Sequence, residues 1–260
     1  MRHLGAIISK EWAETIRNRF LLATVFVLPA IFLLMPLAII YFMQSSPVDP
    51  REVQSYVELN PAYASLSPQE ILAIIIVNQF LFFFLLMPSI IPMTVAAYSI
   101  IGEKQARSLE PLLATPVSTA ELLLGKAAAA LAPAVLLTWI AYAIFVGGAS
   151  LITTSAVLGS ILDPMWLLAM IVIGPLVGVL SVFVGVIISS RVNDTRIAQQ
   201  LGGLLALPIA AFAVAQTAGF VLFDLTSFAI GAIVLLAIDA VVFVVGVRLF
   251  QRDRILTEWK

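Results

Sequence analysis

Six long apolar runs restrict the fold that this chain can adopt. Each has about the 20 residues that an α-helix needs to cross the hydrocarbon core of a bilayer. The runs cover residues 20–43, 71–101, 122–146, 165–189, 201–223 and 228–250. None alternates with a period of two, so membrane-spanning strands are not expected. We therefore predict an all-α integral membrane protein with six transmembrane helices.

The composition excludes a soluble globular domain. Of the 260 residues, 62% are hydrophobic and 11% are charged, whereas soluble domains are about half apolar and a quarter charged. A net charge of −1 gives no basic field that would attract nucleic acid. The sequence has no cysteine, and its single histidine is His3. We expect no catalytic residues, no metal site and no cofactor bound by this chain.

The basic residues predict how the chain lies in the membrane. Lys and Arg are enriched in cytoplasmic loops. With the N-terminus inside, all 14 of these residues except Arg51 fall in inner segments. The first run lacks a small-residue cleavage site, which favours an uncleaved helix over a signal peptide. We expect a multi-pass protein of the cell membrane with both termini in the cytoplasm.

The stretch before the first span has the pattern of an amphipathic helix. Lys10, Glu14 and Arg17 lie opposite one apolar arc on a helical wheel. The apolar arc contains Leu4, Ile8, Trp12 and Ile16. Residues 1–19 are therefore predicted to form a helix along the cytoplasmic leaflet, with a frayed tail as the alternative. The membrane domain would cover residues 20–250, and residues 251–260 would form a cytoplasmic tail.

The inner connection between the second and third spans carries the most information. Ser118 and Glu121 have the spacing of a capping box, which predicts a helix beginning at Thr119. The stretch before it mixes charges with three leucines. Those leucines are Leu109, Leu112 and Leu113. Two interpretations stay open: a docking element for a cytoplasmic partner, or a linker whose leucines pack against the bundle.

The same connection resembles the signature of the ABC-2 type permeases, the membrane subunits of ABC exporters. The resemblance includes Lys10-Glu11 and Arg17-Asn18-Arg19 before the first span. In the connection it rests on Gly102-Glu103-Lys104, Ser108-Leu109-Glu110, Leu112–Ser118, Glu121-Leu122 and Gly125-Lys126. Pro111 departs from the family pattern and predicts a break at Glu110, because proline cannot continue a helix.

The resemblance implies a permease that moves an unidentified substrate with ATP hydrolysed by a separate subunit. That ATPase would bind ATP and Mg²⁺ and dock on the element from Glu103 to Thr115. The docking residues would be Glu103, Leu109, Glu110, Leu112 and Leu113. A second permease chain, either a homodimer mate or a sister chain, would meet spans one and five. Gly125-Lys126 lacks the upstream glycine and following hydroxyl of a phosphate loop, so ATP binding by this chain is not expected.

Asp239 lies near the middle of the last apolar run. A carboxylate in a span usually faces a bundle interior or a cavity. It would either contact an ion or polar substrate, or bond to a polar group on a neighbouring helix. The candidate partners are Asn78, Gln79 and Gln216.

An ion-coupled secondary transporter is the alternative function, with Asp239 as its coupling carboxylate. Such transporters often contain a repeated half with matching interrupted helices, and no such repeat is visible here. A membrane enzyme is a third option, but the spans lack paired carboxylates and clusters of histidine or cysteine.

The remaining segments predict local features. Residues 44–70 would form either a small ordered cap or a solvated linker, and the mildly apolar stretch 147–164 is able to dip into the membrane. Gly174 and Gly178 have the small-xxx-small spacing of a close helix contact. Interior prolines in spans one to five predict kinks.

Overall fold

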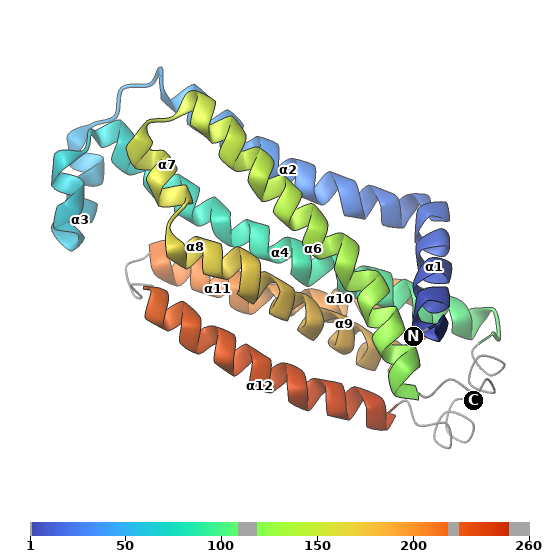
Figure 1. Cartoon of the computed structure of the whole chain (residues 1–260). Coiled ribbons are helices and arrows are strands. Elements are labelled where there is room, and N and C mark those ends of the chain that lie inside the picture. The colour runs from blue at the N-terminus through green and yellow to red at the C-terminus, as the bar shows by residue number, and fades with distance from the viewer. Residues whose placement is uncertain (1, 109–118, 218–223, 250–260) are drawn as a thin grey trace.

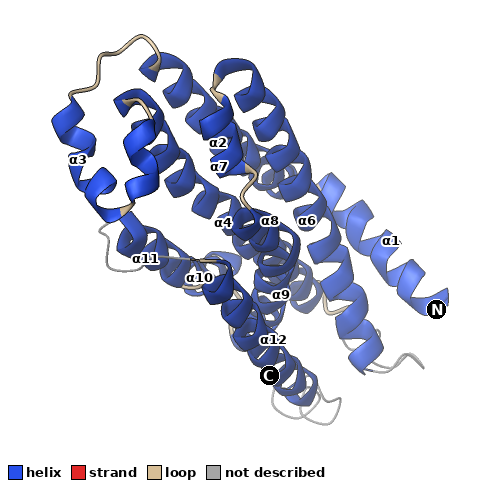
Figure 2. Cartoon of the chain, turned by 60° about the vertical axis from the view of Figure 1, so that its left-hand side comes forward, coloured by secondary structure: helices blue, strands red, loops and turns tan. Residues whose placement is uncertain are grey.

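The computed structural model describes residues 2–108, 119–217 and 224–249. Within them the secondary structure is entirely helical, as Figure 2 shows. Six helical segments in this part of the chain are long and apolar enough to cross a membrane. They cover Leu21–Met43, Pro68–Gln105, Glu121–Ile152, Ser155–Arg191, Thr195–Ala215 and Leu225–Arg248. The predicted all-α membrane architecture is confirmed.

The N-terminal stretch forms a helix that is separate from the first span. α1 (Arg2–Arg17) ends just before Asn18, and α2 (Arg19–Met43) follows. The Asn18 side chain accepts a hydrogen bond from the Leu21 amide at 3.3 Å, which caps the new helix. Figure 1 shows α1 turning sharply away from α2 at this point.

The connection between the first two spans is helical, which agrees with a small ordered cap and not with a solvated linker. It contains α3 (Pro50–Leu59) and the short helix η1 (Pro61–Ser65). Asp49 caps α3. Ser67 and Glu70 then form a reciprocal capping box at the start of the second span.

The second span forms the centre of the bundle. In the most apolar stretch of α4 (Pro68–Gln105), 61% of the residues are buried, against 22% in α2. α4 packs against α2, α6 (Thr119–Ile152) and α9 (Gly174–Arg191), and Figure 1 shows it running between them. α6 is described from Thr119, and the capping residue expected before it, Ser118, lies outside the described residues, so the expected helix start stays a prediction.

The connection between the third and fourth spans packs against the bundle. α7 (Ser155–Ile161) contacts α4 and α6 and buries Val157 and Ile161. Its burial among helices explains the mildly apolar composition of this stretch, because these side chains fill protein contacts.

The fourth span is continuous but contains a wide turn. α8 (Pro164–Leu168) leads into the π-helical turn η2 (Ala169–Ile173), and α9 (Gly174–Arg191) follows. Pro175 lacks the amide hydrogen that a regular turn would use, and a π-turn is one way to absorb that loss. The indole nitrogen of Trp139 donates to the Met170 carbonyl in this turn at 2.9 Å.

Glycines allow α9 to lie close to α4. A Cβ added at Gly178 would lie 3.3 Å from the Pro88 carbonyl oxygen and 2.4 Å from a Leu131 methyl group. A Cβ at Gly185 would lie 3.1 Å from the Met93 carbonyl oxygen. These contacts agree with the close helix contact expected at Gly178.

The fifth span begins earlier than expected and is interrupted. α10 (Thr195–Gly203) and α11 (Ala206–Thr217) are separate helices, whereas one run from residue 201 was expected. The Asp194 carboxylate caps α10, so the polar residues that suggested a loop form a helical turn. The break lies just before Pro208, where proline disfavours a regular preceding turn. α12 (Leu225–Leu249) completes the described part of the bundle.

Candidate functional site

α1 is held against α6 by a close backbone approach. A Cβ added at Gly125 would lie 2.9 Å from Ile7 Cγ2, so glycine leaves room for the side chain of Ile7. The Trp12 indole nitrogen donates to the Ala129 carbonyl at 2.9 Å. Both contacts are on α6, which fixes α1 beside the cytoplasm-facing end predicted for the third span.

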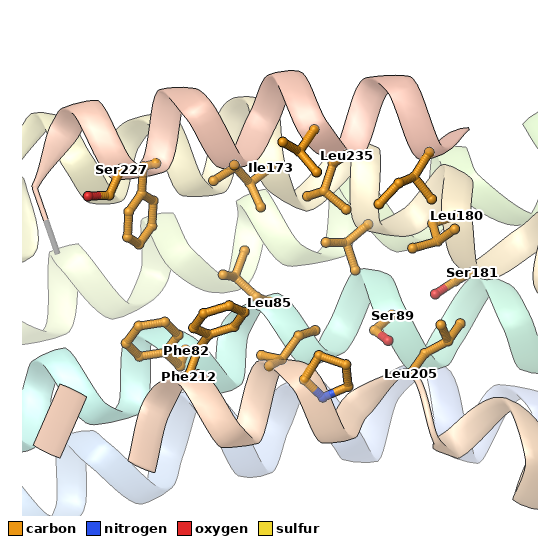
Figure 3. Close-up of a pocket in the computed structure, with 17 residues that line it drawn as sticks. Phe82, Leu85, Ser89, Ile173, Leu180, Ser181, Leu205, Phe212, Ser227 and Leu235 are labelled. Atoms are coloured by element: carbon orange, nitrogen blue, oxygen red, sulfur yellow. The ribbon is translucent and has the colours of Figure 1, made fainter. Parts of the chain in front are cut away.

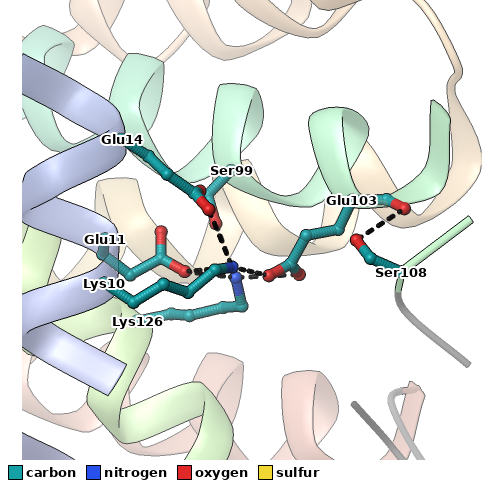
Figure 4. A network of polar contacts seen from close by, with 7 residues as sticks. All are labelled: Lys10, Glu11, Glu14, Ser99, Glu103, Ser108 and Lys126. Atoms are coloured by element: carbon teal, nitrogen blue, oxygen red, sulfur yellow. Dashed lines mark hydrogen bonds and ion pairs between the residues drawn. The ribbon is translucent and has the colours of Figure 1, made fainter. Parts of the chain in front are cut away.

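Four charged side chains meet where α1, α4 and α6 converge (Figure 4). We call Lys10, Glu11, Glu103 and Lys126 the ion-pair cluster. Lys126 Nζ donates to Glu11 Oε1 at 2.7 Å and lies 2.9 Å from Glu103 Oε2 in an ion pair without hydrogen-bond geometry. Lys10 Nζ donates to the other oxygen of Glu103. The two carboxylates are thus shared between two ammonium groups on different helices.

The burial of this cluster makes its charge balance important. Glu11, Glu103 and Lys126 are only 3%, 5% and 4% exposed. Isolated charges at such sites cost several kcal/mol, and opposite partners offset that penalty. Two positive and two negative groups give a net charge of zero. The cluster therefore joins three helices at a position where removing one member leaves an unpaired charge.

Two residues at the edge of the cluster extend it. Lys126 Nζ also donates to Ser99 Oγ on α4 at 2.6 Å. Lys10 Nζ lies 3.3 Å from the Glu14 carboxylate one helical turn along α1. Ser99 adds a second point of attachment to α4, whereas the exposed Glu14 contributes little because water screens its charge.

The contacts of the ion-pair cluster shift the pKa values of Glu11 and Lys10 on α1. Burial alone would raise the pKa of Glu11, but the charge and hydrogen bond of Lys126, with help from Ser99 and Lys10, hold that pKa below its ordinary value. Burial alone would lower the pKa of Lys10, but Glu103 and the nearby carboxylates hold it above its ordinary value. Both α1 residues therefore stay charged across the neutral range.

The end of α4 connects the cluster to the predicted docking element. The Ser108 amide donates to the Glu103 carbonyl at 3.0 Å, and the Arg107 amide donates to the Lys104 carbonyl at 3.1 Å. Arg107 adopts a positive φ of 52°. These features form a Schellman motif, which ends helices with a left-handed residue. The chain leaves α4 in a direction set by residues next to the cluster.

Lys104 ties the same end of α4 to the end of α9. Its Nζ donates to the carbonyls of Ser189 at 2.8 Å, Ser190 at 2.9 Å and Val192 at 3.2 Å. A lysine at a helix C-terminus satisfies carbonyls that have no partner within the helix. This end of α4 is therefore braced by α1 and α6 through Glu103 and by α9 through Lys104.

Of the predicted docking residues, the structure describes only Glu103. Glu103 is buried within the cluster, and its carboxylate is directed toward α1 and α6. Leu109, Glu110, Leu112 and Leu113 lie outside the described residues, as does the expected break at Pro111. Within this chain, Glu103 braces the start of the element.

A comparison with protein families decides the identity. The family described as ABC-2 family transporter protein matches residues 5–223, which include all of the ion-pair cluster. The chain belongs to the ABC-2 transporter family. A comparison with curated proteins gives no match. The ABC-2 match agrees with the resemblance seen at the inner connection, and members of this family are membrane subunits of transporters.

The ABC-2 protein carries exposed apolar side chains on α1. Trp12 and Ile16 are 43% and 64% exposed, whereas Ile7 and Glu11 face the bundle. The side chain of Leu4 lies outside the described part. The helix is confirmed, and its position along the leaflet stays a prediction that the exposed indole supports.

The polar residues expected to pair with Asp239 have other surroundings. Asp239 is 5% exposed, and neither of its carboxylate oxygens has a hydrogen-bond partner among the described residues. Asn78 Oδ1 instead accepts from the Trp166 indole at 2.7 Å, so the expected Asn78–Asp239 pair is not formed. Gln79 is on α4, and the side chain of Gln216 is outside the described part.

Proposed function

We propose that this chain is the membrane subunit of an ABC exporter in the cell membrane. It moves an unidentified substrate with ATP hydrolysed by a separate ATPase subunit. The observation that carries the proposal is the ABC-2 family match over residues 5–223 of a chain with six candidate spans. The sequence contains no phosphate loop of its own, which is consistent with nucleotide and Mg²⁺ binding in a partner.

Docking of the ATPase takes place at the cytoplasmic end of α4. Leu109, Leu112 and Leu113 follow directly on the Schellman motif and supply apolar side chains for a groove on the partner. The ion-pair cluster gives this region a rigid base, because Glu103 is bound to α1 and α6. Movement of the ATPase would thus displace α1, α4 and α6 together. This chain itself would carry out no catalysis.

Two permease chains assemble around the transport pathway, as a homodimer or with a sister chain. α2 and the fifth span bury only 22% and 17% of their most apolar stretches within this chain. Their exposed sides are available to a second chain or to lipid. The last span is also only 17% buried, so the choice of these two spans for the proposed interface rests on what the family resemblance implies.

The ion-coupled alternative is less well supported. The family match favours an ABC-type permease, and Asp239 has no described polar partner that would complete an ion site. Exchange of Asp239 for Asn separates the two functions. An exporter that uses this residue only within the bundle should retain transport, whereas loss of transport with intact assembly and ATP hydrolysis would favour the ion-coupled role.

Native mass spectrometry of the complex purified from its own membranes tests the proposed function. The expected particle contains two permease chains and ATPase subunits that carry a phosphate loop. A single permease copy without a sister chain would contradict the assembly, and a permease particle without any ATPase would contradict the exporter.

A further inference from the structure

A cavity of about 380 Å³ lies within one protomer, between α4, α9, α11 and α12 (Figure 3). All its lining residues belong to candidate membrane spans. The volume falls in the range of sites for small organic molecules, about 300–1,000 Å³. The cavity is distinct from the ion-pair cluster, with which it shares no residue.

The described lining is apolar except for three serines and contains no charged side chain. Ser227 lies in the first turn of α12, while Ser89 and Ser181 lie deep in α4 and α9. A charged ligand would find no opposite charge on these walls, and burying it unpaired would be unfavourable. The lining therefore selects an uncharged molecule with a mostly apolar body.

Ser181 supplies the polar feature that a ligand would meet. It is fully buried, and its Oγ has no hydrogen-bond partner among the described residues. Other buried hydroxyls in the spans bond to the preceding turn, as Thr94 does to Ile90 and Thr138 to Ala134. In Figure 3 the Ser181 hydroxyl points toward the interior of the cavity. A buried hydroxyl without a partner is unfavourable, so a ligand that bonds to it removes a penalty.

One wall of the cavity is held in place before any ligand binds. The rings of Phe82 and Phe228 line it and pack edge-on against Trp166, with centroids 5.0 Å and 5.8 Å away. Trp166 is 1% exposed and is fixed by its hydrogen bond to Asn78. This arrangement gives Asn78 a structural role, and a preformed apolar wall is typical of ligand sites.

We propose that this cavity binds a small uncharged amphiphile, with its apolar body between α11 and α12 and one hydroxyl or carbonyl group at Ser181. The site is a property of this chain alone and goes beyond the proposed docking of an ATPase. Binding therefore requires neither ATP nor a second subunit.

Photolabelling of the full chain in lipid nanodiscs tests the proposal. The probe is a medium-chain primary alcohol with a diazirine, and the matched alkane probe lacks the hydroxyl. Saturable labelling of cavity-lining peptides by the alcohol, competed by unlabelled alcohol, is expected. Labelling that never saturates, as for the acyl chains of bulk lipid, would overturn the proposal.

Two substitutions localise the site. A Cβ added at Gly231, which lines the cavity, meets no atom within 4 Å, so Gly231→Leu should occupy part of the cavity and weaken saturable labelling. Gly147 on α6 has equally open space and does not line the cavity, so Gly147→Leu is the control and should label as the wild type does. Unchanged labelling of Gly231→Leu, or loss in both variants, would overturn the proposal.

Ser181→Ala tests the polar contact. It should weaken binding of the alcohol by about three- to tenfold, the range that one hydrogen bond contributes, and leave the alkane unaffected. The thermal midpoint of this variant without ligand should not fall, because the hydroxyl has no described partner to lose. Equal affinity of wild type and variant for the alcohol would contradict the assignment.

Discussion

Lys126 joins three helices through one ammonium group. It bonds to Glu11 on α1, to Ser99 on α4 and, as an ion pair, to Glu103 on α4, although its own position is on α6. Its contacts differ from those of a surface lysine, whose ion pairs are worth under about 1 kcal/mol. The stability of this end of the molecule should therefore depend on Lys126.

Exchange of Lys126 for Met should lower the free energy of unfolding by about 3 kcal/mol or more, because two carboxylates lose a buried partner. The double variant with Glu11→Leu should lose less than the sum of the single variants, since it removes one stranded charge. Thermal unfolding of correctly inserted protein measures both. A Lys126→Met variant as stable as the wild type would show that the pairing contributes nothing.

Arg107 holds a backbone conformation that favours glycine. A left-handed conformation costs an L-residue about 1 kcal/mol or more. Arg107→Gly should therefore raise the stability by about 1 kcal/mol, while Arg107→Ala should give no such gain because alanine also has a Cβ. Thermal midpoints of the two variants make the comparison. Equal midpoints would contradict the strain assigned to φ 52°.

At the scale of elements, α1 is attached to the bundle by charges as well as by apolar packing. Its pH dependence follows from Glu11 and Lys10. The lowered pKa of Glu11 stabilises the attachment above about 4.5, its ordinary value, and this contribution is lost as the pH falls through the lowered pKa. The raised pKa of Lys10 stabilises below about 10.5 and is lost as the pH rises through the raised value.

The stability difference between wild type and Glu11→Gln should thus be constant at pH values between these limits and shrink in acid. Thermal midpoints of both proteins across pH 3 to 9 measure this difference, and Glu14→Gln is the control because Glu14 is exposed. A difference that grows on acidification would reverse the sign and contradict the pairing of Glu11 with Lys126.

The elements differ in how far the sequence predicts them. The six spans are predictable from the lengths of the apolar runs. A helix in lipid must form its backbone hydrogen bonds within itself, so it needs no distant partner. The interrupted fifth span and the π-turn before Pro175 depend on how neighbours accommodate a proline, so their positions were not evident. The early start of α10 was missed because Asp194 and Arg196 resemble a loop until the cap is seen.

The ion-pair cluster was also missed, although each of its members is visible in the sequence. Glu11 and Lys126 are separated by 115 positions, and no local periodicity relates them. A signal was available: these acidic and basic residues lie on the amphipathic helix before the first span and near the ends of two apolar spans, all predicted to be on the cytoplasmic side of the membrane. The resemblance marked Lys10-Glu11, Glu103 and Lys126 without indicating that they touch.

At the scale of the whole molecule, the predicted topology places α1 and α3 on opposite sides of the membrane. The chain has no cysteine, so single cysteines report their side without interference. Ser55→Cys in α3 should react with an impermeant maleimide in intact cells, and Ser9→Cys in α1 should react only after permeabilisation. Both side chains are exposed. The reverse pattern would overturn the orientation.

We propose that a separate ATPase docks on the leucines that follow α4. Burial of one leucine is worth about 1.5–3 kcal/mol, so losing two should weaken docking by a hundredfold or more at about 1.4 kcal/mol per factor of ten. Leu124 and Leu151 are exposed on α6 outside the docking element, so Leu124→Ala with Leu151→Ala is the matched control.

Co-purification of the ATPase with the tagged chain from native membranes measures this docking. The Leu109→Ala, Leu113→Ala variant, inserted and with a thermal midpoint equal to that of the wild type, should lose the ATPase, and the control pair should retain it. We propose that Glu110 lies at the rim of the docking site, where an ion pair contributes little, so Glu110→Gln should change mainly the salt dependence of co-purification. Undiminished co-purification and transport by the Leu109→Ala, Leu113→Ala variant would contradict docking at this element.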